Sequence, residues 1–179
     1  MIVDVRSIRA SGVLVALILF GCARFGGLTM GDVKRDLSER FPDVPVTSVA
    51  ELQEMMSADA GLVLIDAREV EEFSVSHLKG AEHAVIVAEV RPLLREVGVP
   101  VVVYCSVGYR SAELADRLIR ASVPGVYNFP GSIFEWANAG LPLYRGDELV
   151  KEVHPYDDHW GRLLDPRQVR ISKTPSPAE

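Results

Sequence analysis

Short apolar runs alternate with amphipathic segments through the middle of the chain. Three runs have the length and composition of buried strands, and they lie at residues 62–65, 101–104 and 126–129. Four segments have apolar residues at helical spacing or helix-forming composition: 48–57, 89–97, 111–121 and 132–139. Strands that alternate with helices predict an α/β fold with a central parallel sheet flanked by helices on both faces. In such sheets, ligand sites lie at the carboxyl ends of strands.

The regions on either side of this alternation have different compositions. Residues 31–40 are charged and predict a helical lead-in, and residues 41–45 contain two prolines and predict an extended linker. Near the C-terminus, residues 153–160 are aromatic and charged. Because Tyr156 and Trp160 would otherwise expose much aromatic surface, we expect this part to pack back over the domain. The last residues, from Lys173 on, have a composition typical of disorder.

The second apolar run leads directly to Cys105 and a short polar loop. Such a loop can direct backbone N–H groups inward, and the helix predicted from Ser111 adds partial positive charge at its start. Both effects favour a thiolate, which is the nucleophilic form of cysteine. Gly108 permits a positive φ or the close approach of a ligand, and Arg110 supplies a planar donor fork for an oxyanion. We expect Cys105 at the mouth of the loop; the alternative is a small apolar residue that ends a core strand.

Three segments, in the right order, resemble the signatures of the rhodanese family. The first runs from Val63 to Ala81, the second from Cys105 to Ser111, and the third from Val126 to Pro142. The resemblance covers about residues 47–145, which corresponds to one rhodanese domain. Gly131 and Ser132 stand where the family usually has two glycines, and a serine is expected to be tolerated there unless the position needs a positive φ.

The resemblance implies the rhodanese-like fold and sulfur transfer. Cys105 would attack the outer sulfur of a donor such as thiosulfate or a thiol persulfide, hold it as a persulfide, and pass it to a thiophilic acceptor. The substrate-binding loop would consist of Ser106, Val107, Gly108, Tyr109, Arg110 and Ser111. Arg110 would orient the anionic end of the donor, and the loop N–H groups would stabilise the charged cysteine.

Three residues of the first signature are expected to support the site. Asp66 and Arg68 follow a predicted strand, where a carboxylate and a guanidinium are expected to fix neighbouring loops. His77 precedes Leu-Lys-Gly-Ala, in the position where the family has a scaffold histidine, and we interpret it as part of the loop packing.

Loop length separates sulfur transfer from other chemistries of this fold. Four residues separate Cys105 from Arg110, whereas related phosphatases and arsenate reductases carry five. A smaller ring of N–H groups suits a persulfide sulfur better than a tetrahedral phosphate, so phosphatase or arsenate reductase activity is a distant third hypothesis. The main alternative is a non-catalytic rhodanese-like binding or regulatory module. Because Val107 and Tyr109 make the loop less basic, thiosulfate need not be the preferred donor.

Composition and charge limit the classes of molecule that the protein is expected to bind. The chain has 179 residues, 48% of them hydrophobic, a formal net charge of −6 and a pI near 5.3, which argues against nucleic acid. Two cysteines are too few for a disulfide framework, and the histidine spacings match no metal motif. We predict no metal and no cofactor, and small-molecule or protein sulfur donors and acceptors as partners.

The N-terminal segment resembles a targeting signal. Arg6 and Arg9 precede an apolar run at residues 13–20 that is shorter than the ~20 residues needed to span a bilayer, as in a signal peptide. The run ends at Cys22 in a sequence that resembles the bacterial lipoprotein box, which favours a lipid-anchored protein of the cell envelope with membrane association through this segment. The alternative is a true start at Met30 and a cytoplasmic protein. We thus predict four segments: 1–29 (signal or start-site artefact), 30–46 (lead-in and linker), 47–145 (rhodanese domain) and 146–179 (C-terminal extension).

Overall fold

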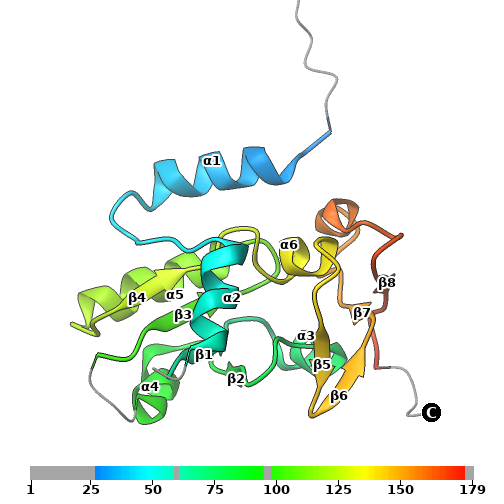
Figure 1. Ribbon diagram of the computed structural model, residues 1–179. Helices are drawn as coiled ribbons and strands as arrows, with labels where there is room; N and C mark the ends of the chain where they lie inside the picture. Colours follow the sequence, from blue (N-terminus) through cyan, green and yellow to red (C-terminus); the bar gives the residue numbers. More distant parts are fainter. Residues whose placement is uncertain (1–26, 59–60, 95–97, 176–179) are drawn as a thin grey trace, which may run out of the picture.

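The computed structural model describes residues 27–58, 61–94 and 98–175. At its centre lies a sheet of four parallel strands in the order β2-β1-β3-β4 (Figure 1). The strands are β1 (Val63–Asp66), β2 (Glu82–His83), β3 (Val101–Tyr104) and β4 (Val126–Asn128). The predicted α/β fold with a central parallel sheet is confirmed.

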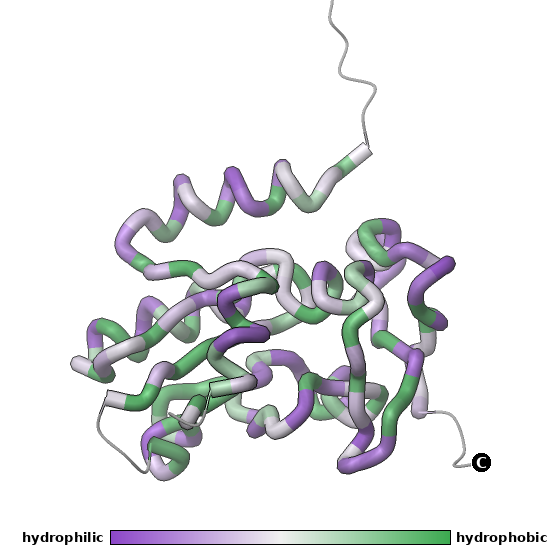
Figure 2. The backbone as a smooth tube through the Cα atoms, viewed as in Figure 1, coloured by the Kyte–Doolittle hydropathy of each residue, from purple (hydrophilic) through white to green (hydrophobic). Residues whose placement is uncertain are grey.

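The central strand β3 is buried along its whole length and divides the hydrophobic interior into two cores. Its side chains alternate between the faces of the sheet, so Val102 and Tyr104 belong to one core and Val101 and Val103 to the other. Figure 2 shows this central strand as hydrophobic, whereas hydrophilic and hydrophobic residues alternate along the outer helix α1 (Met30–Arg40).

Helices cover both faces of the sheet, as expected. The first core receives residues from α1, α2 (Val49–Ser57) and α6 (Ser132–Asn138). The second core receives residues from α4 (Val87–Val90) and α5 (Tyr109–Arg120). The short helix α3 (Val70–Val75) lies between β1 and β2 in the chain.

Two helices differ from their predicted bounds by more than one residue at an end. The segment expected to be a helix over 89–97 is instead α4 followed by a 3₁₀ turn, η1 (Arg91–Leu93), and residues 95–97 lie outside the described part. Pro92 explains the change, because it has no N–H to continue an α-helical ladder. Helix α5 begins at Tyr109, two residues before the expected start.

The chain beyond β5 (Leu143–Arg145) packs back on the domain, as expected for residues 153–160, and Trp160 is partly buried against the first core. Tyr156 nevertheless keeps an exposed fraction of 47%. β5 and β6 (Glu148–Val150) form a hairpin, and β7 (Glu152–Val153) pairs with β8 (Arg170–Ile171). The 3₁₀ turn η2 (Trp160–Leu163) lies beside α6 (Figure 1) because Asn138 donates to the Leu163 carbonyl and accepts from the Asp165 amide, at 2.7 Å each.

Cys22, the candidate lipidation site, lies outside the described residues. The lipoprotein interpretation and the alternative start at Met30 therefore stay predictions. Within the described ranges, no helix is both long enough and apolar enough to cross a membrane.

Candidate active site

Cys105 follows β3 directly and lies just before α5, at the carboxyl edge of the sheet. It is a free cysteine with an exposed fraction of 1%, so the expectation that it lies open at the mouth of the loop is wrong. The loop turns at Gly108, whose φ is +122°, and a Cβ atom there would lie 2.7 Å from Leu37 Cδ1 and 3.1 Å from Pro130 Cα. Only glycine fits this backbone and this close packing.

Two hydrogen-bond donors lie next to the Cys105 sulfur. The Gly108 amide donates to Sγ at 3.1 Å, and the Ser111 hydroxyl lies 3.5 Å from Sγ and 3.1 Å from the Gly108 carbonyl oxygen. The first turn of α5, with its partial positive charge, begins at the same point. Donors and a helix start arranged in this way suit a negatively charged sulfur.

The carbonyl groups of the loop point away from its centre. The amides of Ile133 and Phe134, at the start of α6, donate to the carbonyls of Cys105 and Ser106 at 3.2 Å, and the Gly131 amide donates to Val107 at 2.9 Å. Each peptide group is planar and its N–H points opposite to its C=O. Three loop carbonyls are therefore turned toward α6, and the Gly108 amide is directed at Sγ, as expected for this amide from the sequence.

Ser132 holds the backbone of Cys105 itself. Its fully buried hydroxyl accepts from the Cys105 amide at 3.0 Å and donates to the Phe129 carbonyl at 2.7 Å. Its φ is +52°, so the position needs the left-handed conformation. In that conformation a serine was not expected to be tolerated. The two hydrogen bonds are the interactions that offset this strain.

Arg110 is engaged by a carboxylate from α3. Its two terminal nitrogens bind Glu72 at 2.6 and 2.9 Å, and Ser106 Oγ accepts from Arg110 at 2.9 Å while it donates to Glu72 at 2.8 Å. Burial raises the pKa of Glu72, but the hydrogen bond and charge of Arg110 outweigh it and hold this pKa below its ordinary value. Burial lowers the pKa of Arg110, but the hydrogen bond and charge of Glu72 raise it by more, so this pKa lies above its ordinary value. The pair is therefore fully ionised, and the Arg110 fork is occupied by Glu72.

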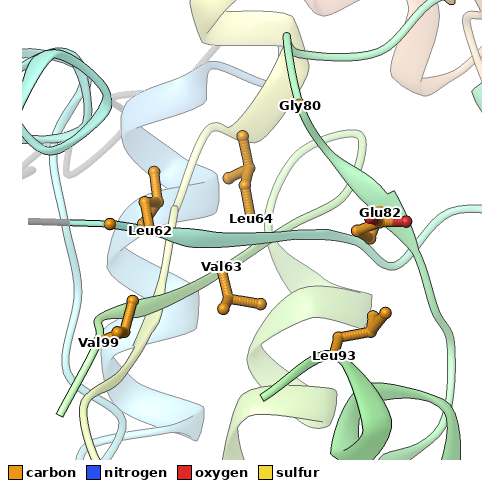
Figure 3. Close-up of a pocket in the computed structure, with 8 residues that line it drawn as sticks. Leu62, Val63, Leu64, Gly80, Glu82, Leu93 and Val99 are labelled. Carbon is orange, nitrogen blue, oxygen red and sulfur yellow. The ribbon is translucent and has the colours of Figure 1, made fainter. Parts of the chain in front are cut away.

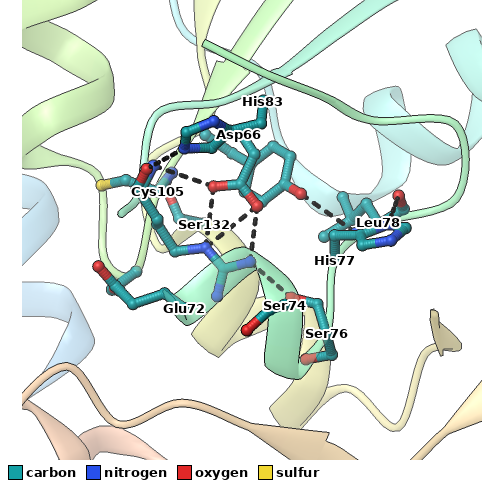
Figure 4. Close-up of polar contacts among 12 residues, drawn as sticks. Asp66, Glu72, Ser74, Ser76, His77, Leu78, His83, Cys105 and Ser132 are labelled. Atoms are coloured by element: carbon teal, nitrogen blue, oxygen red, sulfur yellow. Dashed lines mark hydrogen bonds and ion pairs between the residues drawn. The ribbon is translucent and has the colours of Figure 1, made fainter. Parts of the chain in front are cut away.

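Asp66 and Arg68 form a second, fully buried ion pair, with 2.6 Å between Nη2 and Oδ2 (Figure 4). Burial lowers the pKa of Arg68, and the charge of Asp66 raises it by more, so the guanidinium stays protonated. Arg68 also donates to the Ser76 carbonyl at 2.6 Å, and its own carbonyl lies 2.7 Å from His83 Nε2. These bonds tie the end of β1 to Ser76, which follows α3, and to His83 of β2.

His77 lies in the same network and contacts scaffold groups. Its ring stacks on Phe73 with 4.3 Å between centroids, Nδ1 lies 3.0 Å from the Leu78 carbonyl, and Nε2 accepts from the Gly146 amide at 3.1 Å. Both ring nitrogens therefore contact backbone groups of the scaffold. The Tyr104 hydroxyl accepts from the Leu78 amide at 3.1 Å, and burial together with Asp66 raises the pKa of Tyr104 well above its ordinary value.

A cavity of about 190 Å³ opens above Cys105. One part of its lining comes from the loop and the start of α5, including Tyr109 and Arg110. The other part, Tyr156 and Trp160, comes from the C-terminal extension.

This arrangement of a cysteine loop between a parallel strand and a helix agrees with a comparison with known families. The family model for the rhodanese-like domain matches residues 48–139. The chain belongs to the rhodanese-like domain family. The matched region contains both buried ion-pair residues Asp66 and Arg68, the loop from Cys105 to Ser111, and Ser132.

Relatives of this rhodanese-like protein carry one recurrent name. The thiosulfate sulfurtransferase GlpE of Haemophilus influenzae is 27% identical over 101 residues, which are 56% of this chain and 96% of that protein. The protein of the same name from Vibrio cholerae is 27% identical over 106 residues, 59% of this chain and 96% of its own. The crystal structure of a thiosulfate sulfurtransferase from Pseudomonas aeruginosa is 25% identical, with a TM-score of 0.54, and the match covers 65% of this chain and 23% of that one.

A second cavity of the rhodanese-like domain lies away from the loop. It has a volume of about 270 Å³ and is lined mainly by apolar residues from β1, η1 and the segment before β3 (Figure 3). Among the described residues that line it, Glu82 is the single titratable side chain. Across the part of the chain that the structure describes, no three His, Cys, Asp or Glu side chains gather as a metal ion would require.

Sequence reasoning missed four groups at the site. Glu72 lies in the first signature as part of Glu-Glu-Phe, and a carboxylate there could have been paired with the cationic loop. Ser132 was noted as a departure from the family, yet its hydroxyl bond to Cys105 depends on a backbone angle that the sequence does not reveal. Tyr156 and Trp160 were expected to pack back, with no signal that they reach the loop.

Proposed function

We propose that this protein is a sulfurtransferase that carries a sulfane sulfur as a persulfide on Cys105. The observation that carries the proposal is the environment of Cys105 Sγ. This sulfur accepts a hydrogen bond from the Gly108 amide at 3.1 Å, faces the Ser111 hydroxyl and borders a small cavity. The relatives named thiosulfate sulfurtransferase support the same chemistry.

The transfer takes two displacements at sulfur. The Cys105 thiolate attacks the outer sulfur of the donor, a new S–S bond forms, and the rest of the donor leaves with the electron pair of the broken bond. A thiophilic acceptor, such as cyanide or a thiolate, then takes the outer sulfur and returns Cys105 to the thiolate. Backbone amides of the loop from Ser106 to Ser111 stabilise the anionic sulfur in both states. The Arg110–Glu72 pair positions the loop through Ser106.

The alternative, a binding or regulatory module without turnover, has one observation in its favour. The exposed fraction of Cys105 is 1%, so the sulfur is nearly closed to solvent, although it borders the cavity between the loop and the C-terminal extension. A direct test for a sulfur adduct separates the two functions.

The test is the intact mass of the purified protein after incubation with thiosulfate or a thiol persulfide, followed by cyanide. We expect one added sulfur in the wild type, released as thiocyanate by cyanide, and none in Cys105→Ser. Because the chain has a second cysteine, Cys22→Ser is the matched control and is expected to keep the adduct. A protein that accepts sulfur from none of these donors would be a binding module, and an adduct that persists in Cys105→Ser would place the chemistry elsewhere.

A further inference from the structure

We propose that Tyr156 and Trp160 of the C-terminal extension select a sulfur donor whose sulfane sulfur is bonded to a sulfur atom that carries an apolar or aromatic organic group. The inference rests on the proposed sulfurtransferase function and concerns which donor is used. Organic persulfides and thiosulfonates have this chemistry, and inorganic thiosulfate does not.

The extension is anchored firmly enough to shape the cavity. Glu152 is 1% exposed, its Oε1 lies 2.8 Å from Arg170 Nη2, and its carbonyl accepts from the Ser76 hydroxyl at 2.5 Å. Leu164 and Val169 are buried in the same core as the sheet. The segment between these anchors is therefore held against the domain at both ends.

Tyr156 is held in an unusual backbone conformation at the cavity. Its φ is +63°, and its amide donates to His154 Nδ1 at 3.0 Å. A left-handed tyrosine costs conformational energy, and such strain gathers at functional positions. The conformation places the tyrosine ring over the Arg110 guanidinium, 4.8 Å from the centroid.

Trp160 completes the aromatic wall by packing against α5. Its ring lies 5.6 Å from that of Tyr109, centroid to centroid. The Tyr109 hydroxyl donates to Asp36 at 2.7 Å, and burial together with Asp36 raises the pKa of Tyr109 to about 12. The phenol is therefore neutral at physiological pH, and the cavity presents three aromatic side chains.

Little uncompensated positive charge faces this cavity to attract a dianion. The Arg110 charge is matched by Glu72, and Arg40, which lies near the Tyr109 ring, is paired with Asp36 at 2.8 Å. A thiosulfate dianion would lose hydration here without gaining a free cation. An organic group would instead bury apolar surface against the aromatic rings.

The volume of the cavity limits the organic group. At about 190 Å³ it is smaller than the ~300–1,000 Å³ of pockets for drug-sized ligands. The donor that fits is therefore small, with an organic part no larger than about one ring.

Two thiosulfonates test the selection because they differ only in the organic group. In both, the Cys105 thiolate forms an S–S bond to the sulfane sulfur, the S–SO₂R bond breaks, and the sulfinate RSO₂⁻ leaves with the electron pair; cyanide then releases thiocyanate. The measurement is kcat/KM for benzenethiosulfonate, methanethiosulfonate and thiosulfate at one cyanide concentration. We expect the ratio of benzene to methane donor to be about tenfold higher in the wild type than in Tyr156→Ala/Trp160→Ala. Comparing ratios between variants removes the intrinsic reactivity of each donor.

The control variant is Tyr144→Ala, which removes a half-buried aromatic side chain that lines a different cavity. It is expected to keep the wild-type ratio. A second measurement needs only the wild type: benzenesulfinate is expected to inhibit transfer more strongly than methanesulfinate. This inhibition decides the question if the double variant does not fold.

The outcomes separate the two proposals. If no donor yields thiocyanate, the sulfurtransferase function fails. If all donors react, the ratio is unchanged in the double variant and the two sulfinates inhibit equally, the function stands and the donor selection is wrong.

Discussion

Ser132 occupies a position where the backbone favours glycine, and its hydroxyl pairs two buried backbone groups at the site. Ser132→Ala would keep the positive φ and leave the Cys105 amide and the Phe129 carbonyl without their partner. An unpaired buried polar group costs about 1–3 kcal/mol, so we expect this loss in the free energy of unfolding. Ser132→Gly loses the same bonds but relieves the left-handed strain, by about 1 kcal/mol.

Urea denaturation checks this order of stability, which is wild type, then Ser132→Gly, then Ser132→Ala. A wild-type free energy of unfolding in the alanine variant would mean that the hydroxyl does not hold the Cys105 backbone. Equal stability of the glycine and alanine variants would remove the argument from strain.

Glu72 gives the ion pair at the loop a defined pH dependence. Its folded pKa lies below the ordinary value of 4.5, so the pair stabilises the fold fully above that pH and the stabilisation is lost as pH falls through the folded pKa. We expect Glu72→Gln to be less stable than the wild type by about 2 kcal/mol near neutral pH, since Arg110 then loses its counter-ion. The difference should shrink below about pH 4.5.

The measurement is the free energy of unfolding of both proteins between pH 3 and 7. Glu71→Gln is the control, because Glu71 is exposed and lies next to Glu72 in the same helix. A gap between wild type and Glu72→Gln that widens as the pH falls would contradict the assignment.

At the scale of elements, the C-terminal extension belongs to the same folding unit as the sheet. Val153, Leu164 and Val169 are buried in the core that also contains α2 and α6. Removing the chain from Asp147 on would remove these three side chains from the core, and the burial of each stabilises the fold by about 1.5–3 kcal/mol. We expect a fall in Tm on the order of 10 °C for the truncated protein.

Thermal unfolding of the full and truncated chains checks this expectation. A shorter truncation from Thr174 serves as control, because it removes residues beyond β8 and none of these buried contacts. An unchanged Tm after the cut at Asp147 would show that the extension contributes nothing to the stability of the domain.

Local sequence predicted the elements where local chemistry determines them. The strand that leads to Cys105 and the helix α2 follow from an apolar run and from apolar residues at helical spacing, which involve only neighbouring residues. The helix expected over 89–97 was mispredicted, because α4 begins at Val87 and the backbone tightens into a 3₁₀ turn at Pro92 instead of continuing the helix.

At the scale of the whole molecule, the site is assembled from distant parts of the chain, and this limits what the sequence reveals. The loop and its glycine were predictable because the signature is contiguous. The cavity at Cys105 was not, because part of its lining, Tyr156 and Trp160, comes from the C-terminal extension, and the packing of Gly108 depends on Leu37 of α1. Contacts over such separations leave no periodicity or spacing in the sequence.

The same long-range contacts fix the size of the active loop and thereby its chemistry. Four residues separate Cys105 from Arg110, the amides before and within α6 hold the carbonyls of the loop, and Leu37 lies against the Gly108 turn. The ring of amides therefore has little room to expand around a tetrahedral phosphate. We expect the protein to hydrolyse p-nitrophenyl phosphate no faster than Cys105→Ser does. The assay uses a preparation whose sulfur transfer has been measured, so that inactivity reflects the loop and not unfolded protein. Hydrolysis that depends on Cys105 would show that the loop admits phosphate, and would make phosphatase activity the better assignment for the site.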